Sequence, residues 1–404
     1  MKKLLLLCAA LLWGSMMSPL SAESYGSLPV EPVESDETEP ITLRIIPRFD
    51  VEPQIALTEG SKEAVRSHNN LDGTDGFYSN SSVYTHFEGD IIPGLHFHLV
   101  NHWLAGSAEA IRSLYQWTSD FNWCDFATLS YEYEGFTFTV GKECLAVATY
   151  EYDPYDFDCY YVLSSGMWNN LNCYQLGAKV AYSFSDSQEV GFQVSSSPLN
   201  ETPFSEGYLS YSLYGFFDKE EDEDEGFSYR LALNAMQFDR KDAAVPGSKS
   251  NFIWQPSIGL RYDINDFYVG LDAAARFASA SIYDPTLEVP EADLSPIREG
   301  NIILNFGYNY DDKLEFFARA GWEPVSGTYT YLNYAELTED EEYAISYPNG
   351  RGFLGGIGVN WYPLEDSQDL RIHAVVGGSN YAQALSLNFG VTYFFDPLKL
   401  FARK

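Results

Sequence analysis

The sequence has no apolar run long enough to cross a bilayer as a helix, which takes roughly 20 residues. Its longest one, residues 4–13, follows Lys2 and Lys3 and precedes the small pair Ser21-Ala22. That order is typical of a secretory signal peptide with its cleavage site. We therefore expect residues 1–22 to be removed on export, and we expect no membrane-spanning helix in the mature chain.

Basic residues are scarce. The chain carries 24 Lys and Arg against 58 Asp and Glu, a formal net charge of −34. Loss of the two lysines in the signal peptide leaves 22 bases against the same 58 acids, or −36. Nucleic acids bind basic faces, so this balance excludes a nucleic-acid partner.

Catalytic signatures are also missing. The sequence contains no G-x-S-x-G, no phosphate-binding P-loop and no H-E-x-x-H. We expect no enzyme and no cofactor, although His, Ser and carboxylate groups distant in the sequence could still meet in a barrel enzyme.

Cysteine is rare, and no C-x-x-C pair marks a zinc site. The mature chain keeps Cys124, Cys144, Cys159 and Cys173, which permit two disulfides in three connectivities. Cys159 and Cys173 fall in one predicted loop, so they are the favoured pair, with zinc binding as the alternative.

What the chain does have is aromatic residues, 16% of the total, and a period-two alternation of apolar and polar residues from Ile41 onward. Such alternation predicts strands. Residues 23–40 are acidic and proline-bearing and predict a flexible periplasmic lead-in. Sixteen strands are predicted, near 41–52, 77–90, 95–105, 126–134, 136–147, 174–185, 189–198, 208–219, 226–240, 251–264, 267–279, 301–310, 313–324, 351–363, 369–379 and 384–395.

The connections between these strands alternate between short and long. Tight turns such as Glu134-Gly135 and Asn265-Asp266 alternate with long segments such as 148–173 and 325–350. An even number of strands with tight turns at one end and long loops at the other is typical of outer-membrane barrels. We predict an all-β, antiparallel transmembrane barrel over residues 41–395, in the cell outer membrane and in contact with its lipid, with a tail at 396–404.

The two faces of the strands agree with a barrel in lipid. In the last strand, Leu387, Phe389 and Val391 share one parity, and Ser386, Asn388 and Gly390 share the other. The apolar parity should face lipid and the polar parity a wet lumen. Aromatic residues fall where headgroup belts would lie, with Tyr262, Phe267, Tyr308, Tyr310, Trp361 and Tyr393 toward the turns, and Trp103 and Trp322 toward the loops.

Eight basic residues of the strands have the inward parity, which avoids the cost of a cation in lipid. They are Arg44, Arg48, Lys179, Arg230, Arg261, Arg276, Arg319 and Arg371. They could form successive weak sites for a permeating anion. Acids with the same parity could instead neutralise them, and these are Glu88, Glu132, Glu143, Asp272 and Glu315. The sequence therefore leaves ion selectivity open.

A second inward group combines imidazoles and a carboxylate on the second and third predicted strands. Its members are His86, Glu88, His96 and His98, with His102 further along. The short turn between the strands makes Glu88 a cross-strand neighbour of His96 or His98. Such a group could hold a transition metal or change the charge of a pore with pH, or it could simply be polar lining.

The long segment 148–173 is the candidate for a constriction. A loop that folds into the barrel would place phenol and carboxylate groups across the channel. The residues proposed for this role are Tyr152, Asp153, Tyr155, Asp156, Asp158 and Tyr160. A loop that only covers the barrel mouth is the alternative.

The stretch 141–204 resembles the phosphate-selective porin (O/P) family, in particular its Bacteroidota-type members. The similarity lies in Gly141-Lys142 at a strand end, the Tyr/Asp-rich loop, the Asn-Asn-Leu run at 169–177 and the Gln-Val run at 193–198. It implies a sixteen-stranded trimeric porin with anion-binding basic residues in its channel. We accordingly predict a porin for passive diffusion of small solutes or ions, with a barrel anchor, a surface-interaction protein or a barrel enzyme as alternatives.

Overall fold

The computed structural model describes most of the barrel wall and part of what lies inside it. The described residues are 41–69, 81–105, 124–146, 148–151, 163, 165, 167, 173–198, 207–219, 225–237, 251–278, 298–311, 313–326, 350–364, 367–380 and 383–398. The expected signal peptide, the lead-in and most of the tail lie outside these ranges. Within them, no helix is long and apolar enough to cross a bilayer.

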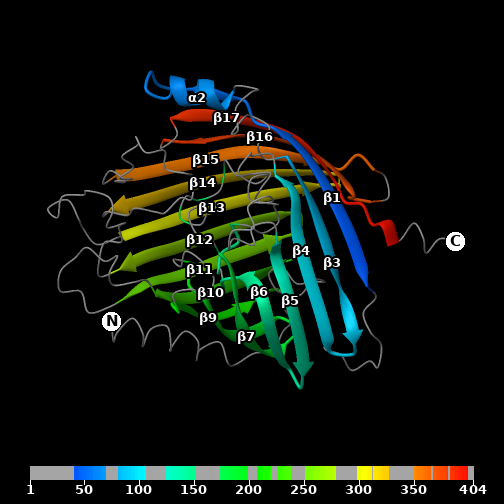
Figure 1. The fold of residues 1–404 in the computed structure, drawn as a ribbon. Coiled ribbons are helices and arrows are strands. Elements are labelled where there is room, and N and C mark those ends of the chain that lie inside the picture. Colours follow the sequence, from blue (N-terminus) through cyan, green and yellow to red (C-terminus); the bar gives the residue numbers. More distant parts are fainter. Residues whose placement is uncertain are drawn as a thin grey trace, which may run out of the picture.

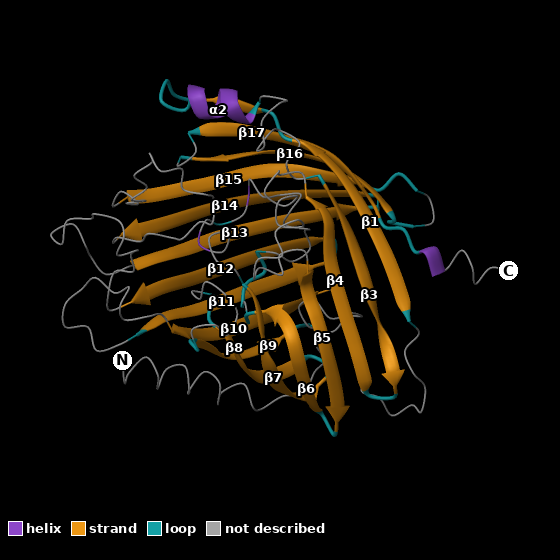
Figure 2. Ribbon diagram, in the orientation of Figure 1, coloured by secondary structure: helices purple, strands orange, loops and turns teal. Residues whose placement is uncertain are grey.

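The described chain is almost entirely strand (Figures 1 and 2). The strands are β1 (Thr42–Val51), β2 (Gln54–Ala56), β3 (Ser82–Ile92), β4 (Leu95–Ala105), β5 (Cys124–Tyr133), β6 (Phe136–Cys144), β7 (Tyr174–Ser185), β8 (Gln188–Ser196), β9 (Leu209–Phe217), β10 (Glu225–Gln237), β11 (Phe252–Ile264), β12 (Phe267–Ala278), β13 (Arg298–Tyr310), β14 (Leu314–Ser326), β15 (Gly350–Trp361), β16 (Leu370–Ser379) and β17 (Ala384–Tyr393). All pairings are antiparallel between neighbours in the chain, apart from those at the closure.

The sheet closes on itself because β1 pairs with β17 on one side and with β3 on the other. Phe395, just past the end of β17, extends the closure by exchanging two backbone hydrogen bonds with Ile45. The three-residue β2 lies beside the far end of β17. Sixteen long strands therefore form a closed barrel, and the prediction of sixteen strands is confirmed.

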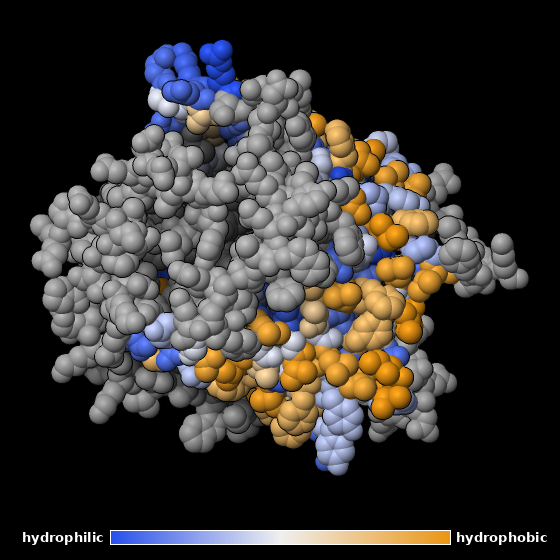
Figure 3. Space-filling view, viewed as in Figure 1, coloured by the Kyte–Doolittle hydropathy of each residue, from blue (hydrophilic) through white to orange (hydrophobic). Residues whose placement is uncertain are grey.

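The two faces of the wall differ in chemistry, as the alternation predicts. Asp272 and Arg276 of β12 are 0% and 1% exposed, whereas their outward neighbours Leu271 and Phe277 are each 37% exposed. Figure 3 shows apolar side chains gathered on the outer surface of the strands on the visible face. In a soluble barrel the apolar face would point inward, so this wall is built to face lipid. Aromatic residues of the predicted belt, including Tyr308, Tyr310 and Trp361, are on the exposed face.

Several tight turns are linked to the neighbouring hairpin by a backbone hydrogen bond, as in Glu132 N–H to Gly94 O and Ser183 N–H to Gly135 O, at 2.8 and 2.9 Å. The Glu134-Gly135 turn has positive φ at both residues, 48° and 80°, the backbone that matches the twist of a two-residue hairpin. Closely linked turns resist fraying at this end of the barrel.

The connection after β1 is more ordered than the sequence indicated. In place of a plain loop at 53–76, β2 is followed by α2 (Lys62–His68), which lies near β17 in Figure 1. Asn69 at the end of the helix exchanges two hydrogen bonds with the backbone of Gln54, at 2.7 and 2.8 Å. These bonds fold the helix back onto the strand, which propensity alone does not predict for so short a helix.

Candidate functional site: the lumen and its inner loop

The chain between β6 and β7, residues 145–173, is called the inner loop here. Most of its described residues are buried against the inward face of the wall, with Leu145 and Glu151 each 1% exposed and Thr149 fully buried. Their partners lie on β8 to β14, up to 168 residues away in sequence. The loop therefore enters the barrel, as the constriction hypothesis requires. The residues named for the constriction itself, 152–160, lie outside the described residues.

Two arginines of the wall hold the backbone of the inner loop. Arg319 on β14 donates from Nη1 to the carbonyl of Leu163 at 2.9 Å and from Nη2 to the carbonyl of Glu151 at 2.5 Å. Arg276 on β12 donates from Nη2 to the carbonyl of Met167 at 2.7 Å. Both guanidinium groups are buried, and a hydrogen bond is stronger in such a low-dielectric environment. The arginines also supply donors to loop carbonyls, and a buried carbonyl without a donor is costly. These two arginines therefore fasten the loop to the wall.

An apolar contact adds to this polar attachment. Leu163 is 1% exposed and packs in one cluster with Tyr268, Phe317 and Val375, from β12, β14 and β16. Room for it comes from Gly356 on β15, where an added Cβ would lie 2.6 Å from the Leu163 side chain. Burial of one leucine contributes about 1.5–3 kcal/mol. The inner loop is thus held by packing as well as by hydrogen bonds.

Tyr150 connects the inner loop to β12 and to the end of β9. Its backbone N–H donates to Asp272 Oδ1 at 2.7 Å, and its hydroxyl donates to Asp218 Oδ1 at 2.9 Å. The guanidinium of Arg230 lies 4.3 Å from the ring centroid and also bonds Asp218. This is a cation–π arrangement in which the tyrosine hydroxyl and the guanidinium bond the same Asp218 carboxylate. Arg230 therefore also stabilises the loop.

Glu151 ties the two limbs of the inner loop together. Its carboxyl group accepts hydrogen bonds from the backbone N–H and the hydroxyl of Ser165, which is also fully buried. Burial raises the pKa of the Glu151 carboxyl, against the opposing effect of Arg319. A raised pKa means that the docked loop binds more protons than a released one.

Docking of the inner loop should accordingly weaken as the pH rises. The stabilisation of loop docking by the protonated Glu151 carboxyl is fully present below the ordinary carboxyl pKa. It is lost as the pH rises through the raised pKa of Glu151 in the docked loop. Amide hydrogen exchange at residues 148–151, corrected for the intrinsic rate, should show faster loop opening at high pH. Glu151→Gln keeps an acceptor for Ser165 and should remove this extra pH dependence. An equal dependence in both proteins would contradict the assignment.

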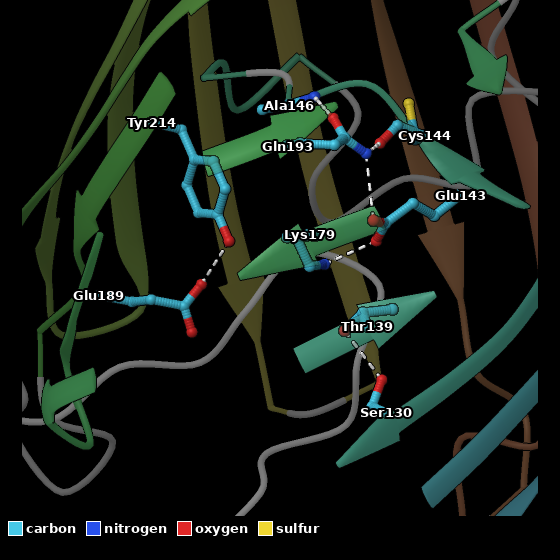
Figure 4. A network of polar contacts seen from close by, with 9 residues as sticks. All are labelled: Ser130, Thr139, Glu143, Cys144, Ala146, Lys179, Glu189, Gln193 and Tyr214. Atoms are coloured by element: carbon cyan, nitrogen blue, oxygen red, sulfur yellow. Dashed lines mark hydrogen bonds and ion pairs between the residues drawn. The ribbon is translucent and has the colours of Figure 1, made fainter. Parts of the chain in front are cut away.

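Beside the loop entrance lies a polar network on the inner face of β6 to β9 (Figure 4). Lys179 Nζ donates to Glu143 at 2.6 Å, and Gln193 Nε2 donates to the other oxygen of Glu143 at 3.1 Å. The Gln193 side-chain oxygen accepts from the backbone N–H of Ala146 at 3.2 Å. The network thus fixes the first residues of the inner loop where the chain leaves β6.

All eight predicted basic residues belong to the inward parity of their strands, but their surroundings differ. Four of them bond carboxylates within 3.1 Å: Lys179 with Glu143, Arg230 with Asp218, Arg261 with Asp263, and Arg276 with Glu299. Arg48 and Arg371 lie over the rings of Tyr84 and Phe394. Arg44 lies opposite His86 in the register of β1 and β3. The sequence did not indicate that several of these bases hold the loop, because their partners are distant in the chain.

The predicted group of imidazoles and a carboxylate on β3 and β4 is arranged as separate cross-strand pairs. Glu88 lies opposite His98, as predicted, with 3.6 Å between its carboxylate and Nε2. His96 lies opposite Asp90 and bonds it at 3.1 Å, not Glu88. The rings of His86 and His98 are 6.3 Å apart. Among the described residues, no group of three or more His, Cys, Asp or Glu is placed to hold a metal ion, so the metal hypothesis gains no support.

Of the favoured pair, Cys159 lies outside the described residues, so the Cys159–Cys173 pairing stays a prediction. Cys173 immediately precedes β7, and its carbonyl accepts a hydrogen bond from Leu145 N at 2.8 Å, which brings it next to Cys144 at the end of β6. Among the described cysteines, Cys144 is therefore a neighbour of Cys173.

The sequence matches none of the known protein-family models, and no curated protein matches it either. Solved structures do resemble the fold. An anion-selective porin from Comamonas acidovorans superposes with a TM-score of 0.53 at 11% identity, covering 88% of this chain and 100% of that one. The trimer form of OmpT, an outer membrane protein of Vibrio cholerae, gives 0.53 at 12% identity over 89% and 100%. The outer membrane channel DcaP of Acinetobacter baumannii gives 0.50 at 11% identity over 91% and 100%. At these identities the likeness establishes the fold alone. Together with the apolar outer face, it shows that the chain has the fold of a transmembrane β-barrel like those of outer-membrane porins.

Proposed function

We propose that the protein is a porin, a passive channel for small hydrophilic solutes whose lumen is narrowed by the inner loop. The observation that supports this most is the attachment of the loop to one wall by Arg276, Arg319 and Leu163. A barrel used only as an anchor has no need for a loop fixed inside it. The attachment uses strands from β8 to β16, so the constriction would lie between the loop and the wall of β1, β3 and β4.

We further propose weak charge selectivity, in place of the strong phosphate selectivity implied by the family resemblance. A selective anion path needs cations that a permeating ion can approach. Lys179, Arg230, Arg261 and Arg276 already bond carboxylates, and Arg319 bonds the loop. Buried acids such as Asp272 and Glu315 add further negative charge to the same face. A homotrimer is part of this proposal, by analogy with the trimer form of OmpT.

The test is single-channel recording in a planar bilayer, with the reversal potential measured under a salt gradient. We expect ohmic channels, a reversal potential near zero and little block by added inorganic phosphate. A strongly anionic reversal potential with phosphate block would support the phosphate-selective alternative. A lack of conductance from correctly folded protein would overturn the porin proposal.

A barrel enzyme is the less supported alternative. Asp50 Oδ1 lies 2.7 Å from His373 Nε2, a juxtaposition that resembles the acid–base pairs of hydrolases. Both side chains are 0% exposed, and the same Nε2 lies 2.6 Å from Asn388 Oδ1. A substrate could not reach a pair buried in this way. The pair is better explained as a stabilising contact across the barrel closure.

A further inference from the structure

We infer that Cys144 and Cys173 form a disulfide that closes the base of the inner loop. Cys144 is the last residue of β6, and Cys173 is the residue before β7. The register pairs Cys144 with Tyr174, and Leu145 N donates to the Cys173 carbonyl at 2.8 Å. The two cysteines are therefore one residue away from being direct cross-strand partners at the point where the hairpin opens.

The side chains meet as well as the backbones. Both residues are thiols in this structure and half-buried, and their side chains are hydrogen-bonded to each other. A disulfide requires Cα atoms about 4.4–6.8 Å apart. Figure 4 shows Cys144 beside the Glu143, Gln193 and Ala146 contacts that fix the start of the loop. Because the ladder ends at Cys144 and Tyr174, Cys173 lies beyond the last strand pair, where its side chain can turn toward Cys144.

The periplasm provides the oxidant that disulfide formation requires. An outer-membrane protein folds after passing through an oxidising periplasm, where disulfides form and persist. Each thiol loses one proton, the two sulfurs share a new bond, and the two electrons reduce the disulfide of a periplasmic thiol oxidant to a dithiol. Cys124 is an unsuitable rival partner, because it is buried and its thiol donates to the Phe126 carbonyl on its own strand at 3.3 Å.

The disulfide would act with the wall contacts. Arg276, Arg319 and Leu163 fasten the middle of the inner loop, whereas the disulfide would fix its two ends. Cross-linking the ends of a loop limits the conformations that the released loop can explore. This inference depends on the fold and the cellular compartment, and not on whether the barrel conducts.

The sequence allows a direct test. The protein is extracted from outer membranes without reductant, denatured in iodoacetamide and digested with trypsin, which leaves Cys144, Cys159 and Cys173 in one peptide, 143–179. Cyanogen bromide then cuts after Met167 and separates Cys173 from the other two. We expect fragments 143–167 and 168–179 to stay joined until a reductant is added. Separate, fully alkylated fragments from the wild-type protein would overturn the proposal.

The matched variant Cys159→Ser distinguishes the two candidate pairings. It leaves Cys144 as the only cysteine of fragment 143–167, so a joined product identifies Cys144–Cys173. Loss of the joined product in Cys159→Ser, with its retention in Cys144→Ser, would instead establish Cys159–Cys173. Mass spectrometry reads both outcomes from denatured protein, so neither depends on the variant conducting.

Discussion

Arg319→Met is expected to release the inner loop from the wall and to raise the channel conductance, with larger fluctuations of the open current. Arg319 makes two bonds to loop carbonyls, Leu163 O and Glu151 O. Hydrogen bonds to charged groups contribute about 1.5–3 kcal/mol each, so their joint loss should shift docking by at least about a hundredfold. Methionine keeps an unbranched apolar side chain at this position, so the change removes the guanidinium and its donors.

The matched control is Arg261→Met. This variant loses the same charge from the inward face, but Arg261 bonds Asp263 on its own strand, at 2.6 and 3.0 Å. We expect its conductance to stay much closer to wild type. Hydrogen exchange at residues 148–151 should rise in Arg319→Met and not in Arg261→Met. If the two variants behave alike, charge and not loop attachment controls the lumen, and the role assigned to Arg319 is wrong.

Leu304→Arg is expected to destabilise the folded barrel strongly. Leu304 lies near the middle of β13, opposite Leu271 of β12 and Ala320 of β14, and its side chain is 40% exposed on the outer face. An arginine near the midplane of the bilayer on the lipid face costs about 2–4 kcal/mol. The free energy of unfolding, measured by denaturant titration in lipid vesicles, should fall by that amount.

Tyr308→Arg is the control for this prediction, on the same strand and face but at a different depth in the bilayer. Tyr308 has the same outward parity on the same strand, is 43% exposed and lies toward the tight-turn rim. Arginine near the interface costs only about 0–1 kcal/mol, because its charge reaches water. A large loss for Leu304→Arg with a small one for Tyr308→Arg would locate the apolar belt. Equal effects would show that lipid does not cover this face as proposed.

The likeness to solved porins and the polar interior agree on architecture but not on selectivity. The Comamonas acidovorans protein is described as anion-selective, yet only 11% of the residues are identical. Selectivity depends on which charged side chains a solute meets, and fold similarity does not transfer those. In this chain four of the eight predicted inward basic residues bond carboxylates, as in the Lys179–Glu143 and Arg276–Glu299 pairs, and Arg319 bonds the inner loop. That is the physical basis for proposing a weakly selective channel.

The sequence was sufficient for the wall of the barrel. Side chains alternate between the faces of a strand, and a strand in lipid excludes charge from one of them, so parity alone places Leu271 outside and Asp272 inside. Tight-turn signals such as Glu134-Gly135 then set the ends of the strands. These signals are local in the chain. The predicted strands consequently agree with the observed ones to within a few residues at most ends, β3 differing most, with a start at Ser82 against the expected 77.

Only the tertiary structure decided what the inward residues do. Arg319 meets the Leu163 and Glu151 carbonyls across 156 and 168 residues of sequence, and Arg276 meets Met167 across 109. Parity fixes the face on which an arginine lies, but its partner depends on which segment enters the lumen and at what height. Cys173 likewise became the neighbour of Cys144 through the register of β6 and β7, while a shared predicted loop had favoured Cys159. Contacts between segments so far apart in the chain leave no periodic trace in the sequence, because the closed barrel alone brings them together.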